Sequence, residues 1–397
     1  MTLTRSVIDW TTDFDYLDSA WTENPYPIWD DLRSRCPIAH TGRFMGAFLP
    51  TRYDDIRAIA QDTEHFSSRR VILREGRPTI PPAPPLTSDP PEHQAERNLL
   101  KAAFTSEAVK RLEPRTRAIC RELLSRLSGE RTCDGAADYA QEIPTRVIAY
   151  MLGVSEDNGS LFRRWVQDFL ELGIGDEVVL RRTWTETHAF FAAEIRKRSG
   201  TARDDLISRL LQARLDGRPL SEERLCGTLM LLLFAGIDTT WSAIGASLWH
   251  LATHPDDRRR LATEPELIPT AVEEFLRAYA PVTMAREVVK ETEIRGCRFR
   301  EGEMVLLAFP AANRDPEKFP NADCVVIDRT PNPHVAFGIG GHRCLGAGLA
   351  TMEMTVALEE WLKMFPEFTL ARAARIPWSK GPVRGPRQLP LLLAGAA

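Results

Sequence analysis

The residues most able to do chemistry lie between positions 337 and 346, where the sequence reads Phe-Gly-Ile-Gly-Gly-His-Arg-Cys-Leu-Gly. Four glycines in ten residues allow the backbone to turn tightly and to approach a flat ligand closely. Cys344 stands directly before an apolar helical pattern over 345–362, and the N-terminus of a helix favours a thiolate. A cysteine in this position is suited to bind a metal or to act as a nucleophile.

Three other interpretations of this loop have to be considered. Cys344 could be an inert buried thiol, the glycines could bind phosphate, or the loop could be half of a zinc site. A phosphate-binding loop of the P-loop type would end in Gly-Lys-Ser or Gly-Lys-Thr, which is absent here. Zinc would need further cysteine or histidine ligands at suitable spacing, and none is nearby in the sequence.

A second motif, Ala235-Gly-Ile-Asp-Thr-Thr240, lies inside a long segment that Ser221 can cap and that reaches towards His254. Between Leu229 and Ile237 this segment is apolar on nearly every side, which predicts a buried helix. A glycine there costs about 1 kcal/mol relative to alanine, and a buried carboxylate costs more unless it is paired. A helix kink with threonine bonded to the preceding turn would explain the threonines but not Asp238.

Two further pairs of charged residues have the spacing of one helix face. Glu274 and Arg277 are three apart, although Glu273 and Arg277 would make an equally good surface pair. His93 and Arg97, four apart, follow Asp89-Pro-Pro, which is typical of a helix start. Both could belong to ordinary solvated faces.

The elements that must position these residues are mainly helical. We expect helices over about 90–103, 106–127 (capped by Ser106), 221–254, 268–279 and 345–362. Strands are expected at 45–49 and 304–309, a hairpin at 292–299 and a late edge strand at 389–393. The proline-rich segment 77–91 predicts a stiff loop, either a linker or a wall over a pocket. The fold class is therefore mainly α with a small β portion.

Composition excludes several classes of protein. The chain has 397 residues and a net charge of −4, without the basic excess of a nucleic-acid-binding domain. The uninterrupted apolar run 229–237 is half the length of a membrane span, and the acidic first thirty residues do not resemble a signal peptide. Seven scattered cysteines suit free thiols in a reducing compartment, so we expect a cytoplasmic protein.

Taken together, the cysteine loop, the 235–240 motif and the upstream Glu-x-x-Arg sequence resemble the cytochrome P450 family, the haem-thiolate monooxygenases. The resemblance implies one haem domain over 1–397, a triangular helical body around a buried haem b. Cys344 would be the axial iron ligand, which increases the electron density on iron. Phe337, Gly338 and Gly346 would shape the sulfur side of the haem. The implied propionate contacts are His93, Arg97, Arg286 and His342.

By the same resemblance, Ala235 would belong to an oxygen-binding groove, and Asp238 and Thr239 would relay the protons that oxygen activation requires. Glu274, Arg277 and Arg329 would be structural. We expect an apolar or aromatic substrate, since the expected pocket walls at 71–85, 165–179, 234, 237–239 and 282–284 are largely apolar. Retention of Asp238-Thr239 argues against variants that use peroxide.

The implied reaction needs O2 and two electrons from outside the chain. Only fifty-three residues follow Cys344 and no dinucleotide-binding glycine motif is present, so an external donor is expected: a 2Fe-2S ferredoxin with its NAD(P)H reductase. Arg343, Lys101, Lys110 and Arg111 could form its docking face or could be scattered solvated charges. We expect a monomer. The alternatives are a non-catalytic haem sensor or carrier, a peroxide-driven oxygenase and a haem-free binding protein.

Overall fold

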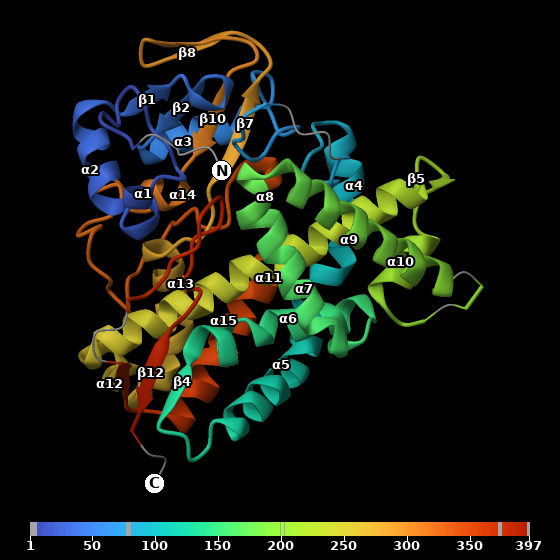
Figure 1. Cartoon of the computed structure of the whole chain (residues 1–397), viewed down its shortest axis with the longest axis vertical. Coiled ribbons are helices and arrows are strands. Elements are labelled where there is room, and N and C mark those ends of the chain that lie inside the picture. The colour runs from blue at the N-terminus through green and yellow to red at the C-terminus, as the bar shows by residue number, and fades with distance from the viewer. Residues whose placement is uncertain (1–5, 77–80, 199, 202, 372–374, 395–397) are drawn as a thin grey trace.

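The structure, a computed structural model, describes residues 6–76, 81–198, 200–201, 203–371 and 375–394. Helices fill most of the molecule, and a small sheet lies at one side with α2 and α3 (Figure 1). The predicted fold class, mainly α with a small β portion, is confirmed. The longer helices are α2 Tyr26–Arg35, α3 Tyr53–Gln61, α4 Glu92–Lys101, α5 Ser106–Arg126, α6 Glu142–Leu152, α7 Gly159–Gln167, α9 Glu177–Arg198, α10 Leu206–Gln212, α11 Glu222–Thr253, α12 Pro255–Thr263, α13 Ile268–Ala278 and α15 Ala347–Met364.

Shorter helical segments connect these. They include α1 Ser19–Glu23, α8 Gly173–Gly175 and α14 Phe309–Ala312, together with the π-helical turns η3 Gly135–Ala140 and η5 Asp168–Leu172. The five predicted helices correspond to α4, α5, α11, α13 and α15, with ends that differ by a few residues.

Within the described residues, the strands form four small sheets. The largest has the order β1-β2-β10-β7-β3, made of Ile38–Thr41, Ala47–Pro50, Met304–Leu307, Met284–Val288 and Phe66–Ser67. The predicted hairpin is β8 Thr292–Ile294 with β9 Cys297–Phe299, and β5 Arg214–Leu215 pairs with β6 Arg218–Pro219. The predicted edge position of residues 389–393 is wrong: β12 Pro390–Leu393 is the central strand between β11 Phe368–Leu370 and β4 Thr132–Asp134. The strands that pair with β12 are distant from it in the sequence, and they determine whether β12 lies at the edge or in the centre of its sheet.

Helix starts follow local hydrogen bonding. Ser221 caps α11 as predicted, accepting from the Arg224 N–H. The α5 cap is Thr105 and not Ser106, because Thr105 is the last residue with extended backbone angles. Asp89 does not cap α4 with its carboxylate, which instead accepts hydrogen bonds from the side chain of Ser67 and the backbone of Ser68. Asp89 thus fastens the start of α4 to the end of β3.

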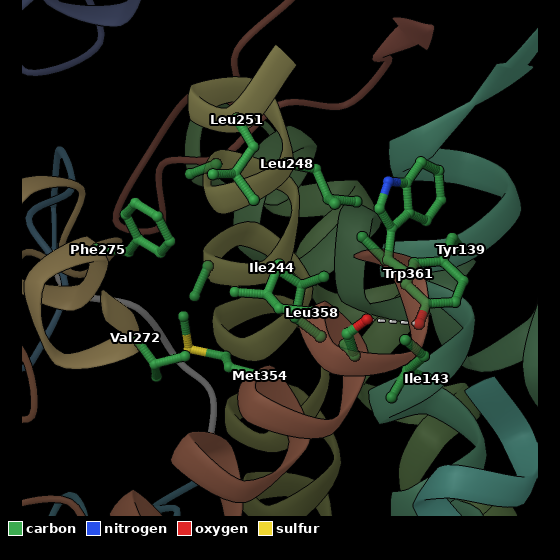
Figure 2. Packing of buried hydrophobic residues seen from close by; sticks show 14 of the residues in the cluster. Tyr139, Ile143, Ile244, Leu248, Leu251, Val272, Phe275, Met354, Leu358 and Trp361 are labelled. Atoms are coloured by element: carbon green, nitrogen blue, oxygen red, sulfur yellow. Dashed lines mark hydrogen bonds between the residues drawn. The ribbon is translucent and has the colours of Figure 1, made fainter. Parts of the chain in front are cut away.

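The core that holds the site lies where α11 crosses α15 and α13. Ile244 and Leu248 of α11 pack near Met354 and Leu358 of α15 (Figure 2). The buried Tyr139 hydroxyl donates to the Ala357 carbonyl at 2.8 Å, so that η3 is joined to α15 by a hydrogen bond. Burying such side chains contributes roughly 1.5–3 kcal/mol each, which makes this crossing a rigid support.

The helix α11 is also long and apolar enough to cross a membrane. However, most of its apolar stretch is buried inside the fold. It packs against α6, α9 and α15. We therefore interpret α11 as the central core helix.

A network of charges joins α5 to α15, and it predicts how stability depends on pH. Burial alone would raise the pKa of Glu360, but hydrogen bonds from Arg121, Arg117 and Lys363 outweigh burial and lower it to about 2. Because the folded value lies below the ordinary 4.5, the network stabilises the fold above pH 4.5 and loses this contribution as the pH falls towards 2.

We expect Glu360→Gln to lower the free energy of unfolding at pH 7 by about 2–3 kcal/mol. Urea denaturation at pH 7 and near pH 3 should show the gap between variant and wild type narrowing at the lower pH. Glu359→Gln is the matched control, since Glu359 contacts only Arg117 of this network and is more exposed. A gap of equal size at both pH values would contradict the prediction.

Candidate functional site

A cavity of about 690 Å³ lies between the cysteine loop, α4, α11 and the segment after β3. Its lining is mainly apolar. The expected walls at 71–85, 165–179, 234 and 282–284 all contribute lining residues, although residues 77–80 lie outside the described part of the chain. Of the expected α11 residues 237–239, only Thr239 lines the cavity, since Ile237 and Asp238 point elsewhere into the core.

The cysteine loop presents Cys344 to this cavity. The Cys344 N–H donates to the Phe337 carbonyl at 2.7 Å, which closes the loop, and α15 begins after Gly346. Gly338 has a φ of +67°, a conformation that glycine adopts without strain. A Cβ at residue 346 would lie 3.9 Å from the Cys344 sulfur, an ordinary contact distance, so the start of α15 lies directly beside the thiol.

The charge state of the Cys344 thiol depends on opposing influences. Burial raises the pKa of Cys344, while the backbone N–H of Gly346 and the guanidinium groups of Arg97 and Arg343 lower it. Among the described residues no group of three or more His, Cys, Asp or Glu side chains could hold a metal ion. The zinc alternative thus finds no ligand set in this part of the chain.

Beside the loop, the structure brings together the four predicted propionate contacts. The His93 and His342 rings lie 3.9 Å apart between centroids, and the Nε2 atom of each is buried without a hydrogen-bond partner. Burial, then the nearby Arg286 and His93, lowers the pKa of His342 to about 3. Burial also lowers the pKa of Arg286 to about 10. Arg97 donates to the Arg343 carbonyl at 2.5 Å.

This cluster fits the anionic edge of a haem. Its two arginines carry positive charge, each of its two histidine rings has an N–H group able to donate, and the charge of Asp89 acts on His93, Arg286 and His342. Buried donors of this kind need acceptors, and two propionates would supply them. Together with a thiol that opens into the same cavity, the residues present fit haem b.

Opposite the cysteine loop, the otherwise buried helix α11 is exposed to the cavity at a few residues. Ala235 is exposed to the cavity in the middle of this helix. Gly236 has a different role: a Cβ there would lie 2.5 Å from Ile148, so the glycine allows α6 to approach α11. The Thr239 hydroxyl lines the cavity and donates to the Ala235 carbonyl at 2.8 Å.

Asp238 is fully buried behind this groove. Arg387 lies 2.8 Å from its Oδ1 atom, and Oδ2 has no hydrogen-bond partner. Burial raises the pKa of Asp238, against the lowering effect of Arg387. Arg387 also donates to Glu171 at 2.6 Å. Sequence reasoning missed Arg387 and Glu171, which lie far from Asp238 along the chain.

A second buried acid, Glu353 of α15, was also missed. It lines the cavity, its Oε2 atom has no hydrogen-bond partner, and burial raises its pKa well above the ordinary value. The signal available in the sequence is a glutamate on the apolar face of the predicted helix 345–362.

The triad predicted to be structural is confirmed in its contacts. Arg277 forms two hydrogen bonds with Glu274 at 2.7 and 2.8 Å, and both side chains are fully buried. Arg329 donates to the same carboxylate at 3.0 Å. Arg277 also donates to the carbonyls of 313, 322 and 324 and thereby fixes the segment that leads to the cysteine loop.

We expect Arg277→Met to cost about 3–5 kcal/mol, because it leaves a buried carboxylate partly unpaired. Reduced soluble yield and loss of bound haem, measured by absorbance, should follow. Glu273→Gln is the control, since its partners His334 and Thr351 lie at the edge of this network. Haem content equal to wild type in Arg277→Met would oppose this assignment.

Comparisons with known proteins agree with this geometry. Residues 174–377 match the family model described as Cytochrome P450. The mycinamicin IV hydroxylase/epoxidase of Micromonospora griseorubida is 38% identical over 87% of this chain and 89% of its own length. The vitamin D(3) 25-hydroxylase of Pseudonocardia autotrophica is 35% identical over 91% of each chain. The solved structure of PksS from Bacillus subtilis 168 superposes with a TM-score of 0.88 at 32% identity, covering 96% of this chain and 100% of that one.

Proposed function

We propose, since the chain belongs to the cytochrome P450 family, that Cys344 would supply the thiolate that binds the haem iron of this haem-thiolate monooxygenase. The enzyme binds haem b, uses O2 and an external source of electrons, and oxidises a small molecule. The observation that supports the proposal for Cys344 is its thiol, which opens into the cavity that Ala235 and Thr239 of α11 also line. When bound, the haem supplies the activation of O2.

The residues of the chain then have separate tasks. His93, Arg97, Arg286 and His342 bind the propionates, and their buried donors orient the cofactor. Phe337, Gly338 and Gly346 line the cavity beside Cys344 and would contact the haem on the side of the Cys344 sulfur.

On the side of the cavity opposite the cysteine loop, the small side chain of Ala235 leaves room for O2. The Thr239 hydroxyl holds a proton at Oγ1 inside the cavity. Asp238 is a proton source behind it, and Arg387, which also binds Glu171, restrains the Asp238 carboxylate. Two protons are needed to release water, so a hydroxyl backed by an acid is suitable chemistry.

The substrate proposed from the cavity is a bulky, largely apolar molecule. The relatives bear names of a mycinamicin hydroxylase, a vitamin D(3) hydroxylase and a polyketide-biosynthesis enzyme, which supports this size class. We assign residues 1–397 to one haem domain that acts as a cytoplasmic monomer. The electron donor is a 2Fe-2S ferredoxin with its NAD(P)H reductase, and exposed Lys101, Lys110 and Arg343 offer a basic docking face.

The test is the absorption spectrum of the reduced, CO-bound protein. A thiolate ligand displaces the main band far to the red of a histidine-ligated haem. Turnover with ferredoxin, reductase and NAD(P)H should then exceed turnover with hydrogen peroxide. A histidine-type spectrum would exclude Cys344 as ligand, and a preference for peroxide would identify a peroxide-driven enzyme.

A further inference from the structure

We propose that Arg74, in the wall of the cavity, binds a carboxylate on the substrate. The inference deepens the proposed function by naming a substrate class: an acid with an apolar body. The inference rests on the proposed function, because the bound acid would be the substrate of the oxygenase. The evidence that Arg74 binds a carboxylate comes from the surroundings of its guanidinium.

Arg74 is a buried cation, 6% exposed, in the segment that follows β3. Its guanidinium donates to the Gly173 carbonyl at 2.8 Å and to the Phe169 carbonyl at 3.5 Å. These neutral oxygens occupy some of its donors but do not compensate its charge. Burial lowers the pKa of Arg74, which is the effect of a charge removed from water.

No carboxylate of a described residue forms an ion pair with Arg74. The contrast with Arg387 is direct, since that largely buried guanidinium binds two carboxylates, Asp238 and Glu171. The neighbouring Glu75 is engaged elsewhere and accepts from the Phe44 N–H at 2.9 Å. A buried charge without a counter-ion is costly, and an anion arriving from the cavity would remove that cost.

The position of Arg74 relative to α11 indicates which end of the substrate carries the carboxylate. The guanidinium lies 5.9 Å from the centre of the Phe169 ring, which stacks on Phe234 at 4.3 Å with only 5° between the planes. Phe234 directly precedes Ala235, which lines the oxygen groove. A substrate lying along these two rings would reach Ala235 with its apolar body and Arg74 with its carboxylate.

Arg74 is separate from the propionate cluster. Its contacts come from η5 and α8, whereas His93, Arg97 and His342 belong to α4 and the cysteine loop. The groups that influence His342 are Arg286, His93, Asp89 and Arg97, and Arg74 is not among them. The carboxylate is therefore assigned to the substrate and not to the haem.

The test measures binding of matched acids and esters to the holoenzyme by titration calorimetry. Dodecanoate is compared with methyl dodecanoate, and 4-phenylbutyrate with its methyl ester. In the wild type at least one acid should bind about 10-fold more tightly than its ester. Arg74→Gln should reduce the affinity for that acid to the affinity for its ester, while Arg74→Lys should keep part of the preference for the acid.

Arg69→Gln is the matched control, because Arg69 lines the same cavity but has Asp89 as counter-ion at 3.3 Å. It should retain the preference for the acid. If the wild type bound acid and ester with equal affinity in both pairs, the proposal would be overturned. It would also be overturned if Arg74→Gln lowered the affinities for acid and ester equally, because Arg74 would then only support the structure of the cavity wall. The spectrum of the CO-bound protein is independent of this result, so failure here is distinct from failure of the proposed function.

Discussion

Replacing Cys344 with serine is expected to abolish the thiolate-type spectrum and to reduce oxygenation at least about 100-fold. Serine has nearly the same shape, and the hydrogen bond from its backbone to Phe337 would persist. Its hydroxyl, however, ionises far less readily than a thiol and is a poor electron donor to iron. The measurements are the CO-bound spectrum, the haem content and product formation with excess ferredoxin.

The control for this substitution is Cys324→Ser. Cys324 is an exposed free thiol whose backbone carbonyl, and not its sulfur, accepts from Arg277. We expect its spectrum and turnover to match the wild type. A Cys344→Ser protein with a native spectrum and full turnover would remove the basis of the assignment, whatever the other motifs show.

The second large effect is expected at Thr239. In Thr239→Ala the cavity loses the hydroxyl that holds a proton beside Ala235, and general acid catalysis of this kind is worth about 10²-fold or more. Consumption of NAD(P)H and O2 should continue, while the yield of oxygenated product per NAD(P)H falls at least about 10-fold and hydrogen peroxide accumulates. Measuring NAD(P)H, peroxide and product in one assay gives this ratio directly.

Thr239→Ser is the conservative variant and should restore most of the yield, because it retains the hydroxyl. Asp238→Asn should slow turnover with an enlarged solvent isotope effect, since the acid behind the hydroxyl is lost. Glu353→Gln is a matched control for removal of a buried acid and should leave the yield unchanged, because burial raises the pKa of Glu353 and favours its uncharged form, which the neutral amide resembles. Unchanged yield in Thr239→Ala would instead favour a haem protein that does not activate O2.

The sequence by itself determined the parts of the site that depend on short stretches of chain. The glycines around Cys344, the cap at Ser221 and the apolar pattern of α11 act over a few residues through backbone angles and hydrogen bonds. For this reason the cysteine loop and the helices follow the predictions, whereas the position of Thr239 in the cavity was expected from the family resemblance. The propionate cluster could be assembled only through the family resemblance, since spacing alone left His93 and Arg97 on an ordinary face.

Only the tertiary structure decided what the buried charges contact. The partner of Asp238 is Arg387, and the central place of β12 depends on β4 and β11. That Arg74 has no carboxylate partner among the described residues can be recognised only when the acids near it have been placed. Charges and strand edges interact over distances set by the folded chain and not by the sequence. Local patterns therefore indicate where a polar group lies, whereas long-range packing determines whether it has a partner.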